Sequence, residues 1–166
     1  KTEYSYDALG NLVESKDAAN RITRLTYDAK NNLKSLEQVG IAGKALFDYD
    51  ANNNLIKTTD ALGNVSVSTY NADGTLQSKS QMGAGAASSK TTSFTYDWTT
   101  NRMTVTDPVG NTSTVQFDAA GQRLSTTDPQ GNKTQYSYFG SGLVQKITDA
   151  LLRETQFTYD SRGQTK

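Results

Sequence analysis

A short motif that begins with tyrosine and aspartate returns along the chain about every 21 residues. The first copy reads Tyr-Asp-Ala-Leu-Gly-Asn-Leu and starts at Tyr6. The steps to the following copies are 21, 22, 21, 26, 21, 21 and 21 residues, with starts at Tyr27, Tyr49, Tyr70, Tyr96, Phe117, Tyr138 and Tyr159. A period of this length predicts a repeat architecture in which each repeat is one small supersecondary unit.

Most repeats contain two motifs of the form Asp-x-x-Gly or a close variant, and these predict tight turns. The first Asp caps the turn through its side chain, and the fourth residue takes a positive φ. A type I turn of this kind is the usual three-residue hairpin with a bulge. Pro108 and Pro129 occupy the second turn position, and Asn20, Asn31 and Asn53 replace the glycine, as such a turn permits.

Between the turns lie segments in which Thr, Val and aromatic residues alternate, which predicts strands of six to eight residues. We therefore expect two groups of residues to determine the structure. The turn formers are Asp7, Gly10, Asp60, Gly63, Asp128 and Gly131, and the strand aromatics are Tyr27, Tyr49, Tyr96 and Tyr138.

The register across the turns leaves one question open. The first turn places Tyr6 opposite Leu12, and the second places Leu25 opposite Val13. Adjacent residues of a strand point to opposite faces, so Leu12 and Val13 cannot share one face of a regular strand. Either both faces of the sheet are partly apolar, or the register contains further bulges.

Connections this short allow only antiparallel neighbours. The sequence thus predicts an all-β fold: a long antiparallel β-meander of about fifteen strands, forming a curved strip. We expect one array of about seven to eight repeats over residues 1–166, with looser loops near 38–44 and 81–90. Thr100 and Leu152 stand where a glycine is expected, and we expect altered turns there.

Composition argues against several functions. Lys+Arg and Asp+Glu balance at 17 each with no basic run, which does not favour nucleic-acid binding. No apolar stretch of about 20 residues is present to span a membrane. Without Cys or His there is no thiol nucleophile, imidazole base or ordinary zinc site. The acidic residues are spaced by the repeat and not gathered at one place. We therefore expect no enzyme activity, no cofactor and no metal.

The Tyr-Asp-x-x-Gly-Asn-Leu and Asp-x-x-Gly-Asn motifs resemble those of the RHS/YD-repeat family, from Tyr4 to Gly163. This resemblance implies a β-strip wound into a hollow shell. In bacterial RHS effectors and in the BC component of insecticidal toxin complexes, the shell encloses a toxic C-terminal domain, whereas a similar shell in teneurins serves cell adhesion. Because Lys1 and Lys166 both fall within the repeat pattern, we expect a piece of a longer protein.

The function that the resemblance implies is that of a shell segment that encapsulates a C-terminal toxin and helps to deliver it. The rest of the shell and the enclosed toxin would be its partners, and the protein would be secreted or at the bacterial cell surface. Family shells often end in a self-cleaving region with an Asp-Pro-x-Gly motif. Residues 107–110 and 128–131 have this form, but each is followed by Asn and another strand, and we interpret both as ordinary turns.

A second class of function stays open, an extracellular carbohydrate-binding or cell-adhesion repeat domain that binds cell-surface glycan. Exposed Tyr together with Asn, Asp and Gln is typical of carbohydrate-binding surfaces. Trp98 could stack on a sugar, although packing against a neighbouring coil of the shell is favoured. A shell segment should turn a concave face toward its cargo, whereas an adhesin should offer a solvated groove with clustered aromatic residues.

Overall fold

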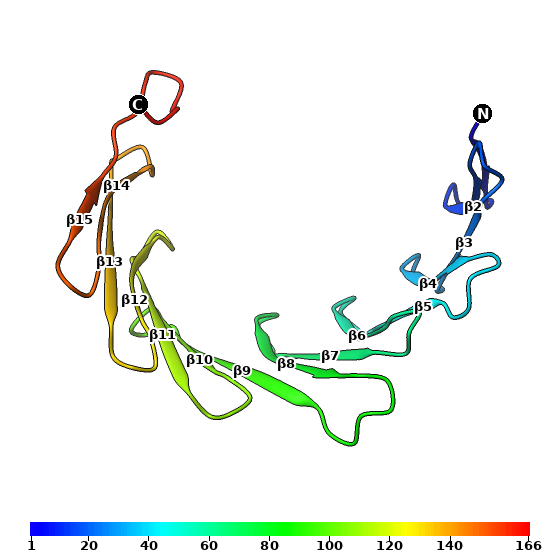
Figure 1. Ribbon diagram of the computed structural model, residues 1–166, viewed down its shortest axis with the longest axis horizontal. Helices are drawn as coiled ribbons and strands as arrows, with labels where there is room; N and C mark the ends of the chain where they lie inside the picture. Colours follow the sequence, from blue (N-terminus) through cyan, green and yellow to red (C-terminus); the bar gives the residue numbers. More distant parts are fainter. The chain divides into compact units, whose positions relative to one another are not determined.

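The computed structural model describes residues 1–166 and consists of strands and turns (Figure 1). No helix of the length and apolar character needed to cross a membrane is present. The strands are β1 (Glu3–Tyr6), β2 (Leu12–Lys16), β3 (Ile22–Tyr27), β4 (Leu33–Gln38), β5 (Ala45–Tyr49), β6 (Leu55–Thr59), β7 (Val65–Tyr70), β8 (Leu76–Met82), β9 (Lys90–Asp97), β10 (Arg102–Thr106), β11 (Thr112–Phe117), β12 (Arg123–Thr127), β13 (Lys133–Tyr138), β14 (Val144–Thr148) and β15 (Glu154–Gln156).

The fifteen strands form one sheet in which every strand neighbours the next one in the sequence. The strand pairs run antiparallel, which confirms the predicted all-β meander. Most strands are shorter than the predicted six to eight residues, because the turns extend further than expected. β2, for example, has five residues. It lies between one turn closed by the Asp7 N–H on the Asn11 carbonyl and another closed by the Asp17 N–H on the Arg21 carbonyl.

A second bulge, beyond the one in the turn itself, answers the question of register. Tyr6 pairs with Leu12 as predicted, but the next pair is Ser5 with Glu14, so that Leu12 and Val13 together oppose Tyr6. A bulge of this kind re-aims the side chains beside it, and both residues are half-buried. The same shift occurs at Tyr27, Tyr49, Tyr70, Phe117 and Tyr138.

The two faces of the sheet differ in chemistry. One face carries the aromatic residues and their aliphatic partners, such as Tyr27 with Leu33 and Leu25 with Leu36. The other carries paired hydroxyls, such as Thr26 Oγ1 with Ser35 Oγ at 2.7 Å and Thr69 Oγ1 with Ser78 Oγ at 2.7 Å. No hydrophobic side chain is fully buried on either face, and the buried residues are Ser35 and Ser125.

Two turns without glycine behave differently from each other. At Thr100 the turn is altered as expected: it is one residue longer, Asp97 pairs directly with Arg102, and the left-handed residue is Asn101 with φ 52°. At Leu152 the expectation of an altered turn is wrong. Leu152 itself takes φ 63°, and its N–H donates to the Asp149 carbonyl at 3.0 Å as in the glycine turns.

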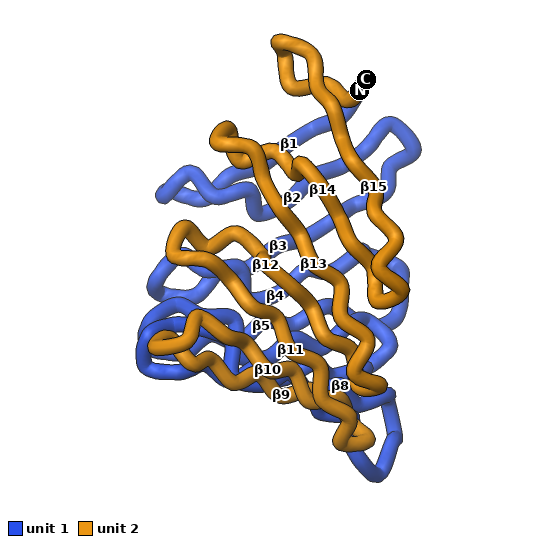
Figure 2. The backbone as a smooth tube through the Cα atoms, turned by 90° about the vertical axis from the view of Figure 1, so that its left-hand side faces the viewer, with its two compact units in different colours: residues 1–91 blue, residues 92–166 orange.

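The chain divides into two compact units, residues 1–91 and 92–166 (Figure 2). Unit 1 contains the tyrosine-aspartate hairpins that begin at Tyr6, Tyr27, Tyr49 and Tyr70, and unit 2 contains the remaining ones. The boundary follows the loop at residues 83–89, and the second loop lies at residues 39–44 within unit 1. The prediction of one domain over the whole chain stays a prediction.

Candidate functional site

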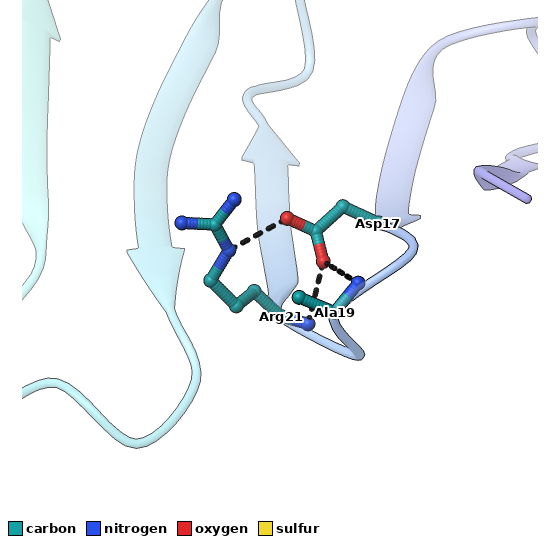
Figure 3. A network of polar contacts seen from close by, with 3 residues as sticks. All are labelled: Asp17, Ala19 and Arg21. Atoms are coloured by element: carbon teal, nitrogen blue, oxygen red, sulfur yellow. Dashed lines mark hydrogen bonds and ion pairs between the residues drawn. The ribbon is translucent and has the colours of Figure 1, made fainter.

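The aspartate that opens each turn closes it with both carboxylate oxygens. Asp7 Oδ1 accepts from the N–H groups of Leu9 and Asn11, each at 2.9 Å, and Oδ2 accepts from the Asn11 side-chain amide at 3.0 Å. In the next turn, Asp17 Oδ1 accepts from the N–H groups of Ala19 and Arg21, and Oδ2 pairs with Arg21 Nε at 2.6 Å (Figure 3). One carboxylate thus holds both ends of a five-residue segment.

The other predicted turn formers lie in the same geometry. Asp60 and Asp128 each accept from a backbone N–H two residues on and another four residues on. Gly10, Gly63 and Gly131 have φ values of 86°, 85° and 85°. A Cβ at Gly131 would meet nothing within 4 Å. Space around this residue is therefore open, and the left-handed backbone alone is the reason for glycine there.

The fifth turn position also has a structural role, which the sequence reasoning missed. Its side chain donates to the second carboxylate oxygen and so locks the aspartate in place. The donors are the amides of Asn11, Asn32, Asn54, Asn64, Asn111 and Asn132 and the guanidinium groups of Arg21 and Arg153. The signal was present in the recurrence of Asn directly after Gly, which turn propensity alone does not require.

These hydrogen bonds hold the pKa values of the turn aspartates below their ordinary value. At Asp60 the largest cause is the side-chain hydrogen bond from Asn64, followed by the backbone hydrogen bond from the same residue. At Asp97 the hydroxyls of Thr99 and Thr100 donate to the carboxylate and lower its pKa to about 2. Hydrogen bonds to a carboxylate favour its charged form, and protonation would weaken every one of them.

A second recurring contact joins each repeat to the one before it. Four motif tyrosines donate their hydroxyl to a backbone carbonyl fifteen residues earlier. The pairs are Tyr27 with Leu12 at 2.9 Å, Tyr70 with Leu55 at 3.0 Å, Tyr138 with Arg123 at 2.9 Å and Tyr159 with Val144 at 2.9 Å. In each case the acceptor is the residue that pairs with the preceding motif aromatic, where the bulge interrupts the ladder.

The exceptions follow the spacing and the bulge. Of the four predicted aromatics, Tyr27 and Tyr138 make this contact, whereas Tyr49 and Tyr96, which follow steps of 22 and 26 residues, do not. Phe117 follows the longer Asp97 turn, which has no bulge, and it lacks the hydroxyl. There the Gln116 side chain donates to the carbonyls of the Asp97 turn instead.

The two Asp-Pro motifs have ordinary turn geometry. Asp107 accepts from the N–H groups of Val109 and Asn111 at 2.9 and 2.8 Å, and its second oxygen accepts from the Asn111 amide at 2.8 Å. Asp128 is held in the same way by Gln130 and Asn132. Each carboxylate is thus engaged in closing its own turn.

Comparison with known families identifies this architecture. The family model described as RHS Repeat matches residues 2–40 and 49–87. The chain belongs to the RHS-repeat family. Each matched segment contains two tyrosine-aspartate hairpins, and the same RHS turns with the same aspartate caps continue through unit 2. Among curated proteins, none matches the chain.

Solved structures share the fold of these RHS repeats. A crystal structure of TcdB2-TccC3-Cdc42 matches with a TM-score of 0.56 and 16% identity. A Tc holotoxin pore from Photorhabdus luminescens, with a mutation in TccC3, matches with a TM-score of 0.56 and 18% identity. Each match covers 99% of this chain, but the chain spans only 11% of the length of the matched chains. The likeness establishes the fold.

Proposed function

We propose that the chain is a segment of the wall of a larger RHS-type shell. The observation that carries this proposal is a sheet with no hydrophobic core. The accessible surface is 11369 Å². A compact protein of 18.0 kDa would expose about 8,000 Å². Such an excess is expected of a sheet that other parts of a larger protein cover, and the matched chains are about nine times as long.

The wall would act mechanically. Consecutive antiparallel strands leave no unpaired edge inside the sheet, the aspartate turns close both of its margins, and the tyrosine hydroxyls join neighbouring repeats. A toxin domain enclosed by this wall would be kept from the producing cell until release. The Tc holotoxin pore among the matched structures supports this role and a bacterial, secreted location. The chain would have no catalytic activity, because its turn carboxylates are committed to closing turns.

Proteolysis of the parent protein tests the proposal. An enclosed domain should resist a protease while the wall is folded, and it should be cut when the wall is opened. Gly43 offers a way to open the wall, because a Cβ there would lie 2.0 Å from the Ala61 carbonyl oxygen. At Gly40, which has a similar φ of 88° against 83°, a Cβ would meet nothing within 4 Å.

We expect Gly43→Ala to make the enclosed domain cleavable at denaturant concentrations where Gly40→Ala still protects it. Both substitutions carry the same backbone strain, so the difference reports the clash with the turn at Ala61. Immediate cleavage of the C-terminal domain in the native protein, under conditions where the repeats stay intact, would rule out encapsulation.

A further inference from the structure

Unit 2 contains a recess on the aromatic face of the sheet, beside the longer Asp97 turn. Its volume is about 350 Å³, and its apolar lining includes Tyr96, Trp98, Met103 and Phe117. Met103 pairs across the strands with Tyr96, and the Phe117 N–H donates to the Asn101 carbonyl at 2.9 Å. The recess lies within the size range of small-molecule sites, about 300–1,000 Å³.

One wall of the recess is an aromatic platform. Trp98 stacks on Tyr96 with a centroid distance of 5.4 Å and an interplanar angle of 12°. Trp98 is nevertheless 61% exposed. An indole that is held flat by a neighbouring ring and remains open to solvent is a rigid surface for a flat, partly apolar ligand.

The rim carries polar groups that the fold does not use. Asp118 Oδ1 accepts from the N–H groups of Ala120 and Gln122, at 2.9 and 2.8 Å. Its Oδ2, which an Asn closes in most other turns, has no partner here because Gln122 occupies the fifth position. The Asn101 carboxamide and the Arg102 guanidinium, which also line the recess, make no hydrogen bond or ion pair.

We propose that this recess binds a neutral hexopyranoside. The C–H groups on one face of a pyranose ring can pack against the Trp98 indole, and C–H contacts with a π face are weakly attractive. The ring hydroxyls are both donors and acceptors, so they match the amide, guanidinium and carboxylate at the rim. A wholly apolar ligand would cover these groups without hydrogen bonds, which is costly. This site does not depend on the shell function and can be tested separately.

Trp98 is the single tryptophan of the chain, so its fluorescence reports on the recess directly. The 166-residue chain would be titrated with cellobiose, chitobiose, maltose and lactose in turn. We expect a saturable change in emission with at least one of them. Saturation-transfer NMR should then show the strongest transfer to the protons of one ring face. Four flat titrations would overturn the proposal, and so would binding of a proline-rich peptide in the absence of any sugar binding.

Variants then localise the binding, with saturation-transfer NMR as the readout because Trp98→Ala removes the fluorophore. We expect Trp98→Ala to weaken binding about tenfold or more, as loss of an aromatic stacking partner does elsewhere. Asp118→Asn keeps the Oδ1 acceptor that closes the turn, and with Arg102→Gln it should weaken binding while the amide spectrum stays folded. Leu151→Ala, at a turn outside the recess, should bind as the parent chain does. Unchanged affinity in Trp98→Ala would place the sugar elsewhere and refute this site.

Discussion

A left-handed backbone conformation at a leucine is the clearest residue-scale departure from the repeat. Leu152 takes φ 63° in a turn whose hydrogen bonds are those of the glycine turns. Its side chain is 79% exposed, so packing offsets little of the strain. A Cβ in this conformation costs on the order of 1–2 kcal/mol. The Asp149 cap and the flanking strands hold the turn in place in spite of that cost.

Leu152→Gly should therefore stabilise the chain. Glycine removes the strain but costs about 0.5–1 kcal/mol in unfolded-state entropy, which leaves a net gain of about 0.5–1 kcal/mol. The matched control is Leu151→Gly, at a neighbour that is 72% exposed and has no positive φ, where only the entropy cost applies. Urea unfolding of the three proteins should rank Leu152→Gly above the parent chain and Leu151→Gly below it. The reverse order would contradict the assignment of strain.

The opposite change at Gly131 should destabilise its hairpin. Gly131→Val forces a β-branched residue to a φ of 85° in open space, which should lower the free energy of unfolding by about 1–2 kcal/mol. Gly131→Asn is the control, because Asn tolerates this conformation and occurs there at Asn20, Asn31 and Asn53. Equal melting temperatures for the Val variant and the parent chain would contradict the account.

At the scale of the element, the tyrosine-aspartate hairpin and its bulge form one device. The bulge interrupts the ladder at a carbonyl, and the hydroxyl of the next motif tyrosine donates to that carbonyl. The contact needs both the bulge and the 21-residue step, as Tyr49, Tyr96 and Phe117 show by lacking it. This gives a physical reason for tyrosine, and not phenylalanine, at most motif positions.

Tyr70→Phe should lower the free energy of unfolding by about 0.5–1.5 kcal/mol, because the hydrogen bond to the Leu55 carbonyl is lost. Tyr49→Phe is the matched control: this tyrosine is also half-buried in unit 1, but its hydroxyl makes no such contact. Chemical denaturation of both variants decides the matter. Equal losses at the two positions would show that the hydroxyl contact is not stabilising.

The turns also predict how stability responds to acid. The aspartate pKa values are lowered in the folded chain, so the turns contribute their full stability above the ordinary value of 3.8. That stability is lost as the pH falls through the folded values, which reach about 2 at Asp97. The urea midpoint should therefore fall between about pH 4 and pH 2. Asp60→Asn should flatten part of this dependence, and a midpoint independent of pH in that window would contradict the role of the carboxylates.

At the scale of the whole molecule, the sequence predicts the fold well because its determinants are local. Spacing, turn residues and alternation each constrain neighbouring residues, and short connections leave only an antiparallel meander. The bulges beside Leu12 and its equivalents were not located, because they depend on cross-strand pairing. The acceptors of the tyrosine hydroxyls lie fifteen residues away and depend on those bulges. The recess beside Trp98 likewise depends on an altered turn whose geometry has no sequence signature.

The absence of a core links this fold to the proposed wall. Every strand is satisfied by its neighbours, yet no hydrophobic side chain is fully buried, so each face of the sheet still has apolar surface to cover. The aromatic face, with its tyrosines and leucines, has the larger gain from being covered.

An electron cryo-microscopy map of the parent protein would test the proposed wall most directly. The account predicts that residues 1–166 trace as consecutive antiparallel strands in the wall of a closed shell, with one face turned to an interior that contains further protein density. A map in which both faces of these strands meet bulk solvent, with no enclosed volume, would contradict it.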